Sequence, residues 1–183
     1  ASLMNLGETY ILDGIDRQLL DELQTDSKRS LKEIGSAVGL SAPSVMERVR
    51  KLENAGIIRG YHALLDARRV GLDISAFIGV SISNPQHLNE FEEWVESIPQ
   101  ILECHHVTGG HTLLLKVTTR NTEALELLIS RIRAMEGVAS TETMVVLSTH
   151  TERVELPLPQ GEPESDGRRR KRSRRKPQPS ETT

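Results

Sequence analysis

The side chains best suited to chemistry lie along one predicted helix in the first third of the chain. Val45, Val49 and Leu52 recur at the spacing of one helical face and are expected to point inward. The opposite face then carries polar and charged side chains, with serines near its N-terminal end. Serine hydroxyls bind phosphates or base edges, glutamate accepts a hydrogen bond from cytosine, and arginine reaches guanine. The candidate DNA contacts of this recognition face are Ser41, Pro43, Ser44, Met46, Glu47, Arg50 and Lys51.

A second set of candidate contacts needs only positive charge, because lysine and arginine bind DNA phosphates whatever the base sequence. Its members are Lys28, Arg29, Lys32 and Arg59, together with Lys51. Arg48 lies nearer the buried side of the helix, so we expect it to pair with an acidic neighbour instead. On these residues alone, an ordinary three-helix bundle with a solvated charged face is the alternative.

Positive charge is concentrated in two parts of a chain of 183 residues whose formal net charge is -3. Residues 28–59 hold 7 basic and 3 acidic side chains, and residues 162–183 hold 8 and 4. The rest of the chain is therefore acidic, and the mildly negative total does not exclude a polyanionic partner. The second part contains the basic run 168–176, which is either a solvated extension or a second DNA contact without sequence preference.

Three histidines and a cysteine suggest a metal site, but their spacing does not favour one. His105 and His106 are adjacent on a predicted strand, so they point to opposite faces and cannot both join His111 in one site. Cys104, as the single cysteine, excludes an internal disulfide framework and suits a reducing compartment. We therefore expect neither a metal nor another cofactor. No phosphate loop, nucleophile motif or pair of carboxylates indicates an enzyme.

Three short helices are expected to position the recognition face. Asp13 can cap the first helix, and Ser30 opens the second with a capping-box pattern. Gly39 ends the second helix, Ser41 caps the third, and Gly56 supplies a left-handed terminator. A short helix, a glycine turn and a second capped helix form the helix-turn-helix pattern.

From residue 57 onwards the apolar period changes and predicts strands with two helices among them. A strand over 57–65 is expected to lead out of the helical region. Beyond residue 72 the order is β-α-β-β-α-β, a ferredoxin-like arrangement with both helices on one face of a four-stranded antiparallel sheet. Apolar residues occur on both sides of the strand around Phe77, which predicts dimerisation through the uncovered face. The expected elements are strand 74–82, helix 88–98, strand 101–108, strand 113–117, helix 125–132 ending at Gly137, and strand 138–149.

The sequence thus predicts an α+β chain with two domains and a tail. No apolar run reaches the ~18 residues of a membrane span, and no signal-peptide pattern opens the sequence, so we expect a cytoplasmic protein. The expected boundaries are 10–56 for a helix-turn-helix DNA-binding domain, 57–72 for a connecting strand or linker, 73–156 for a ferredoxin-like domain and 157–183 for a disordered basic tail.

This ordered series of motifs resembles the Lrp/AsnC, or feast/famine, family of transcriptional regulators. The resemblance extends from about Leu12 to Glu155, and the Ser140-Thr141-Glu142-Thr143 stretch is most similar to the AsnC-like branch. The motifs that carry it are Leu12-Asp13-x-Ile15-Asp16-Arg17-x-Leu19-Leu20, Gly39-Leu40-Ser41, Arg48-Val49-x-x-Leu52-Glu53-x-x-Gly56-Ile57-Ile58-x-Gly60-Tyr61 and Val107-Thr108-Gly109.

The resemblance implies a regulator in which a ferredoxin-like effector and oligomerisation domain controls DNA binding. Family members are homodimers that often assemble to tetramers or octamers and bind amino-acid effectors between these domains. The effector loop corresponds here to residues 109–112, which lack the acidic side chains that hold the effector's amino group in many members. The residues carried over as effector contacts are Gly109, Gly110, His111, Thr112, Thr141 and Thr143.

Two other functions are compatible with the sequence. One is an effector-independent architectural protein that bridges DNA. The other is a tetrapyrrole-modifying enzyme, because the sirohaem decarboxylases resemble this family in architecture and use histidines near this region. The regulator interpretation requires double-stranded DNA and a small effector as partners, with no membrane.

Overall fold

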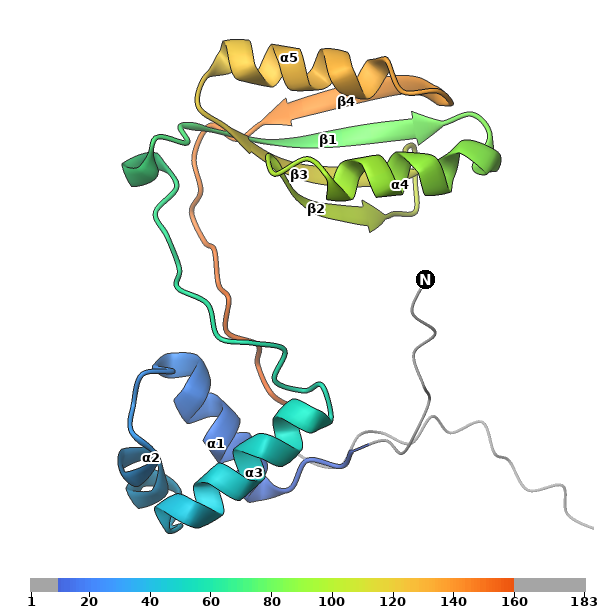
Figure 1. The fold of residues 1–183 in the computed structure, drawn as a ribbon. Helices are drawn as coiled ribbons and strands as arrows, with labels where there is room; N and C mark the ends of the chain where they lie inside the picture. The colour runs from blue at the N-terminus through green and yellow to red at the C-terminus, as the bar shows by residue number, and fades with distance from the viewer. Residues whose placement is uncertain (1–9, 160–183) are drawn as a thin grey trace, which may run out of the picture. The chain divides into compact units, whose positions relative to one another are not determined.

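Three helices form where the sequence predicts them (Figure 1). They are α1 (Gly14–Thr25), α2 (Leu31–Val38) and α3 (Ala42–Asn54). Each begins at the expected cap, because the side chains of Asp13, Ser30 and Ser41 each accept a hydrogen bond from a backbone N–H in the first turn. At the first two, the third helical residue bonds back to complete a capping box. These local hydrogen bonds explain why the helix starts could be predicted from sequence.

The structure, a computed structural model, describes residues 10–159, which divide into two compact units. The helical unit contains residues 10–61 and 153–159, and the sheet unit contains His62–Glu152. The basic run 168–176 lies outside the described residues. Among residues 10–159, no helix is both long and apolar enough to cross a membrane.

The helical unit has its own core, made of the inward faces of all three helices. Residues 153–159, which we call the returning segment, pack against the same unit. The Gln24 side chain on α1 accepts a bond from the Leu156 N–H at 2.7 Å and donates to its carbonyl at 3.2 Å, and Leu158 packs against the core. The fully buried core side chains are Leu19, Ile34, Val45 and Leu52.

The strand expected over residues 57–65 does not form, so that prediction is wrong. A strand needs a second backbone beside it, and within the described chain no backbone pairs with this segment. The N–H groups of Ile57 and Ile58 instead donate to the Leu52 carbonyl and close the end of α3. Leu64 and Leu65 are 75% and 74% exposed. Apolar residues in sequence therefore indicated an extended segment here but not a partner for it.

The sheet unit confirms the βαββαβ order and the ferredoxin-like arrangement. The sheet has the order β2-β3-β1-β4 with antiparallel neighbours, and short 3₁₀ turns occur at Arg68–Val70 and Pro85–His87. Its elements are β1 (Ile74–Ile82), α4 (Leu88–Glu96), β2 (Ile101–His106), β3 (Leu113–Thr119), α5 (Thr122–Arg133) and β4 (Val138–Val145).

Four element ends fall short of the predicted ones. β2 ends at His106 rather than residue 108, and β4 ends at Val145 rather than Thr149, because neither ladder continues further. α4 ends at Glu96 and α5 at Arg133, both earlier than predicted. Apolar spacing continues through each turn that follows, so it overestimates the length of the regular element.

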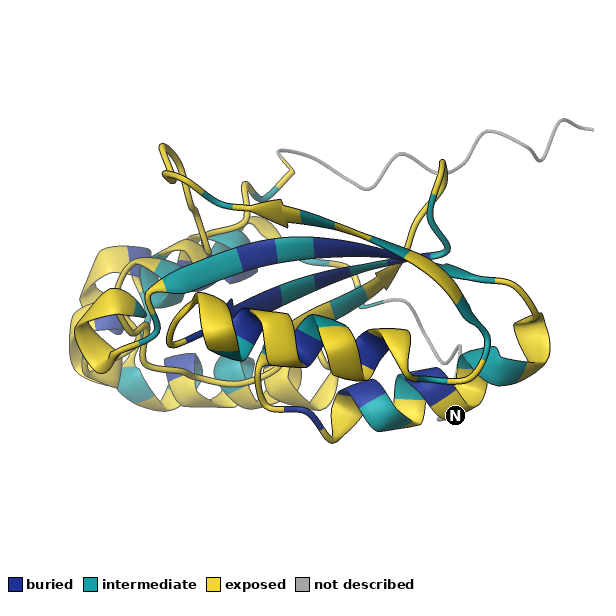
Figure 2. Cartoon of the chain, turned by 90° about the horizontal axis from the view of Figure 1, so that it is seen from above, coloured by how far each residue is buried: buried dark blue, intermediate teal, exposed yellow. Residues whose placement is uncertain are grey.

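The helices α4 and α5 cover one face of the sheet, and the side chains between them and the sheet form the core of this unit. Ala76, Ile78 and Val80 of β1 and Leu113, Leu115 and Val117 of β3 are buried against Phe91 of α4 and Leu128 of α5, among others. Figure 2 shows the same alternation, with buried positions on the strands and on the inner sides of the helices.

The other face, here called the open face, carries the alternate side chains of the strands. The register places Phe77 opposite Lys116 on β3 and Met144 on β4, and Gly79 opposite Leu114. Met144 is exposed and Phe77 and Leu114 are half-buried. The open face therefore has an apolar centre, as the sequence predicted.

Candidate nucleic-acid interface and effector loop

The recognition face lies on the outer side of α3. Val45 and Leu52 are buried on the inner side. At the N-terminal end, the Ser41 hydroxyl caps the helix and lies 2.9 Å from the Ser44 hydroxyl, so the two serines are held together. The exposed members of the face are Ser41, Pro43, Met46, Glu47, Arg50 and Lys51, and Ser44 is half-buried.

The charged members of this face differ in their partners. Glu47 and Lys51 form an ion pair of 2.9 Å one helical turn apart, and their hydrogen bond lowers the pKa of Glu47 and raises that of Lys51. Both side chains are more than half exposed, so the pair is weak and can open when a nucleic acid binds. Among residues 10–159, Arg50 has no ion-pair partner. Its guanidinium is therefore available for an external acceptor.

The candidate phosphate contacts other than Lys51 lie on three segments of the helical unit. Lys28 lies in the turn after α1, Lys32 in the first turn of α2, and Arg59 beyond α3, all exposed. Arg29 differs, because its guanidinium forms an ion pair with Glu22 of α1 and is half-buried. Of the five predicted phosphate contacts, three therefore have exposed charges with no ion-pair partner among the described residues, whereas Arg29 and Lys51 are each paired within the protein.

Arg48 fixes α3 against α1, as the sequence predicted when it placed this residue near the buried side. Its guanidinium donates to Asp13 at 2.7 Å and to Asp16 at 2.8 Å. Asp16 is buried and also accepts from the Tyr10 hydroxyl at 3.2 Å. The hydrogen bond from the Asp16 N–H, followed by the Arg48 guanidinium, holds the pKa of Asp13 below its usual value. Asp16 was missed as a positioning residue, although its place at the third position of a capping box could have indicated it.

The effector loop folds back over the open face. Gly109 has a φ of 118°, which only glycine adopts readily. The His111 ring then lies on Gly79 of β1, where a Cβ would overlap it. Its Nε2 is 2.8 Å from a carboxylate oxygen of Glu142, and its Nδ1 is 3.3 Å from the Ser81 hydroxyl. Glycine at position 79 therefore makes room for the histidine that joins the loop to β4.

The sheet separates the two predicted threonine contacts from this loop. In the register, Thr141 and Thr143 lie opposite Val80 and Ile78, whose side chains point into the core. The Thr141 hydroxyl accepts a bond from Arg133 of α5 at 2.8 Å. Glu142 stands between them and points to the open face. The alternation of side chains along a strand could have singled out Glu142, which the sequence analysis missed as a contact.

Thr112, His105 and His106 have structural partners. The Thr112 hydroxyl accepts from the Ile82 N–H at 3.0 Å. His105 lies 3.0 Å from Glu103 on the open face, and His106 lies 2.5 Å from Glu92 of α4 on the covered face. The prediction that adjacent histidines point to opposite faces is therefore confirmed.

Comparisons with known proteins cover both units. Residues 12–53 match the model of the AsnC-type helix-turn-helix domain, and residues 75–156 match that of the Lrp/AsnC ligand binding domain. The transcriptional regulator FL11 of Pyrococcus horikoshii is 35% identical over 147 residues, covering 80% of this chain and 97% of the relative. LrpA of Mycobacterium tuberculosis is 33% identical over 146 residues, covering 80% and 97%.

Solved structures of transcriptional regulators are also similar to this chain. A transcriptional regulator from Neisseria meningitidis in complex with L-methionine has a TM-score of 0.76 at 30% identity, covering 80% of this chain and 96% of that one. A feast or famine regulatory protein from M. tuberculosis, also complexed with L-methionine, has a TM-score of 0.74 at 33% identity, covering 79% and 98%.

Proposed function

The chain belongs to the Lrp/AsnC family of transcriptional regulators, and we propose that its recognition face makes sequence-specific contacts in the DNA major groove. The observation that carries this proposal is the attachment of α3. A capped helix is held on α1 by Arg48, while Arg50 on its outer side has an exposed guanidinium and no partner among the described residues. In a dimer, two such helices would enter major grooves about one helical turn (~34 Å) apart.

Replacing both Ser44 and Arg50 by alanine should reduce the preference for a specific operator about 10- to 100-fold, because base contacts would be lost. The operator is first selected from random duplexes with the unaltered protein. Binding to that operator and to an unrelated duplex is then measured by fluorescence anisotropy across a salt series.

Lys32→Ala is the matched control, since it removes an exposed charge outside the recognition face. It should weaken binding to both duplexes alike and reduce the salt slope by about 1. If operator preference survives the loss of Ser44 and Arg50, the recognition face has been placed wrongly.

We further propose that the effector loop and Glu142 bind a small-molecule effector, an amino acid. The backbone N–H groups around Gly109 and Gly110 suit an effector carboxylate. The Glu142 carboxylate is 66% exposed and adjoins His111, so it offers an acceptor for the ammonium group that the loop itself lacks. The L-methionine complexes of the N. meningitidis and M. tuberculosis proteins support this class of effector. Thr141 and Thr143 stand on the covered face and are not part of this proposal.

Glu142→Gln should lower the affinity for the amino acid identified in the screen at least about tenfold. The reason is that the ammonium group of this ligand loses a charged hydrogen-bond partner. All the proteinogenic amino acids are screened by thermal shift with the unaltered chain, and the responding one is titrated against the variant. Sizing at each concentration reports assembly at the same time.

Glu103→Gln is the control here, since this carboxylate lies on the same open face but contacts His105 and Lys116. Gly79→Val is a second test, because a side chain at position 79 would displace the His111 ring. An unchanged affinity in both Glu142→Gln and Gly79→Val would contradict the proposed site. If no amino acid changes the melting temperature of the unaltered protein, an architectural DNA-bridging role is favoured instead.

We propose that two copies associate through the open face, with further assembly to tetramers or octamers. The apolar centre of that face, around Phe77 and Met144, supports this association. We also propose that the protein has no enzymatic activity and acts in the cytoplasm, on chromosomal DNA. The naming of the relatives as transcriptional regulators supports both points.

A further inference from the structure

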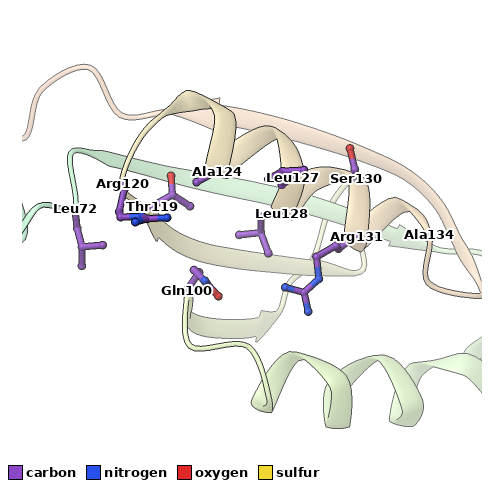
Figure 3. A pocket seen from close by; sticks show the side chains of 10 residues that line it. All are labelled: Leu72, Gln100, Thr119, Arg120, Ala124, Leu127, Leu128, Ser130, Arg131 and Ala134. Carbon is purple, nitrogen blue, oxygen red and sulfur yellow. The ribbon is translucent and has the colours of Figure 1, made fainter.

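A cavity of about 690 Å³ lies beside α5, at one end of the sheet (Figure 3). Thr119 and Arg120, where β3 ends, line it together with Leu72 before β1 and Gln100 before β2. The effector loop precedes β3 and therefore lies at the opposite end of that strand. The cavity is separate from the proposed amino-acid site.

The walls of this cavity are largely apolar. α5 contributes side chains from three successive turns, and Leu72 adds an apolar side chain from the segment before β1. The volume lies within the range of small-molecule sites, which are mostly apolar with a few polar groups. The apolar lining residues are Leu72, Ala124, Leu127, Leu128 and Ala134.

The charged groups of the cavity are all positive. Arg120 and Arg131 line it together with the neutral polar residues Gln100, Thr119 and Ser130, and none of the lining residues is acidic. Arg120 has no ion-pair partner in the part of the chain that the structure describes. In Figure 3 the Arg131 and Gln100 side chains extend toward the same space below α5.

Arg131 is also held in place by an aromatic ring. Its guanidinium carbon lies 5.6 Å from the ring centre of Trp94 on α4. A cation stacked in this way keeps the N–H donors at its edge available, and their planar arrangement matches a carboxylate. The stacking therefore pre-orients the donor and leaves its hydrogen-bonding capacity unused.

We propose that this cavity binds a monocarboxylate with an apolar body, whose charge is held by Arg120 and Arg131. The sign of the lining charges distinguishes this ligand from the amino-acid effector. A zwitterion would bring an ammonium group next to two guanidiniums with no carboxylate among the lining residues to compensate it. A carboxylate without an amino group meets only favourable charges, and its apolar body fills the space along α5.

Octanoate is a suitable probe, and the protein contains its own reporter. Trp94 is the only tryptophan in the chain and adjoins Arg131, so binding at this end of α5 should change its fluorescence. Titration of the full chain with octanoate should give a saturable change. Octylamine, which has the same apolar body and the opposite charge, should give none, and nor should L-leucine.

The variants locate the site by calorimetry, since Arg131 itself touches the fluorescent reporter. Arg120→Gln and Arg131→Gln should each lower the affinity for octanoate at least about tenfold, which is the effect expected for the loss of a charged hydrogen bond. Arg133→Gln is the matched control, because Arg133 lies on the same helix but donates to Thr141 and does not line the cavity. Circular dichroism checks that each variant is folded.

Three outcomes would contradict the binding of a monocarboxylate in this cavity. Absence of saturable octanoate binding, equal binding of octylamine, or an equal loss in Arg133→Gln would overturn the proposal. Glu142→Gln should leave the affinity for octanoate unchanged while it lowers the affinity for the amino acid. The failure of either proposed site can therefore be recognised separately. A loss of octanoate binding in Glu142→Gln would also overturn the assignment to this cavity.

Discussion

Gly35→Ala is expected to lower the free energy of unfolding of the helical unit by about 2–3 kcal/mol, although alanine is the better helix former. Gly35 is buried in α2, and a Cβ there would overlap the Leu40 carbonyl oxygen. The turn cannot simply move away, because the Leu40 N–H donates to the Gly35 carbonyl at 2.8 Å. Val45 of α3 lies only at ordinary contact distance from such a Cβ, so the overlap is with the turn alone. The overlap therefore outweighs the gain in helix propensity of about 1 kcal/mol.

Gly14→Ala is the control for this substitution, since a Cβ at position 14 meets no atom within 4 Å. It should leave stability unchanged or raise it slightly. In urea unfolding, far-ultraviolet circular dichroism reports the helices of both units and Trp94 fluorescence reports the sheet unit alone, so a change seen only by circular dichroism belongs to the helical unit. A Gly35→Ala protein as stable as the unaltered one would show that the turn can adjust, contrary to this argument.

Arg48→Met should destabilise the helical unit by about 3 kcal/mol, because it leaves the buried Asp16 carboxylate without its cationic partner. Methionine keeps much of the apolar stem of the arginine, so the loss reports the charge more than the packing. The same unfolding experiment measures it. Specific DNA binding should fall in parallel at temperatures where the unit begins to unfold, since α3 loses its attachment to α1.

Arg50→Met separates recognition from stability, because Arg50 lies on the same helix with its guanidinium exposed. It should change the free energy of unfolding by less than about 0.5 kcal/mol while reducing operator affinity. Equal stability of Arg48→Met and Arg50→Met would contradict a positioning role for Arg48.

The Arg48 network also predicts the direction of the acid response. The pKa of Asp13 is lowered in the folded state, chiefly by the Asp16 N–H and also by Arg48. Its carboxylate therefore stabilises the fold above its unfolded pKa, and this contribution is lost as pH falls through the lower folded value. Arg48→Met should make that acid-induced loss smaller.

Local hydrogen bonds and charge were the features that the sequence predicted well. The caps of Asp13, Ser30 and Ser41 depend on residues three positions apart, so no tertiary information was needed. Arg48 could be assigned an acidic partner from its position on the helix alone. The identity of that partner, Asp16, required the packing of α3 on α1.

Features that depend on distant segments could not be predicted in the same way. The segment 57–65 has strand-like residues but no backbone beside it in the described chain. Thr141 and Thr143 matched a family pattern, yet the register with β1 turns them into the covered face and presents Glu142 instead. The cavity beside α5 combines Leu72, Gln100 and residues of α5, which no single stretch of sequence brings together.

The returning segment makes the helical unit discontinuous in sequence, with the whole sheet unit inserted between its two parts. The backbone therefore passes between the units twice, near Tyr61 and near Glu152. A protease that cuts once within residues 57–72 would not release the three helices, because Gln24 and the core around Leu158 would still hold the returning segment. Release of a DNA-binding fragment would require a second cut or the dissociation of that contact.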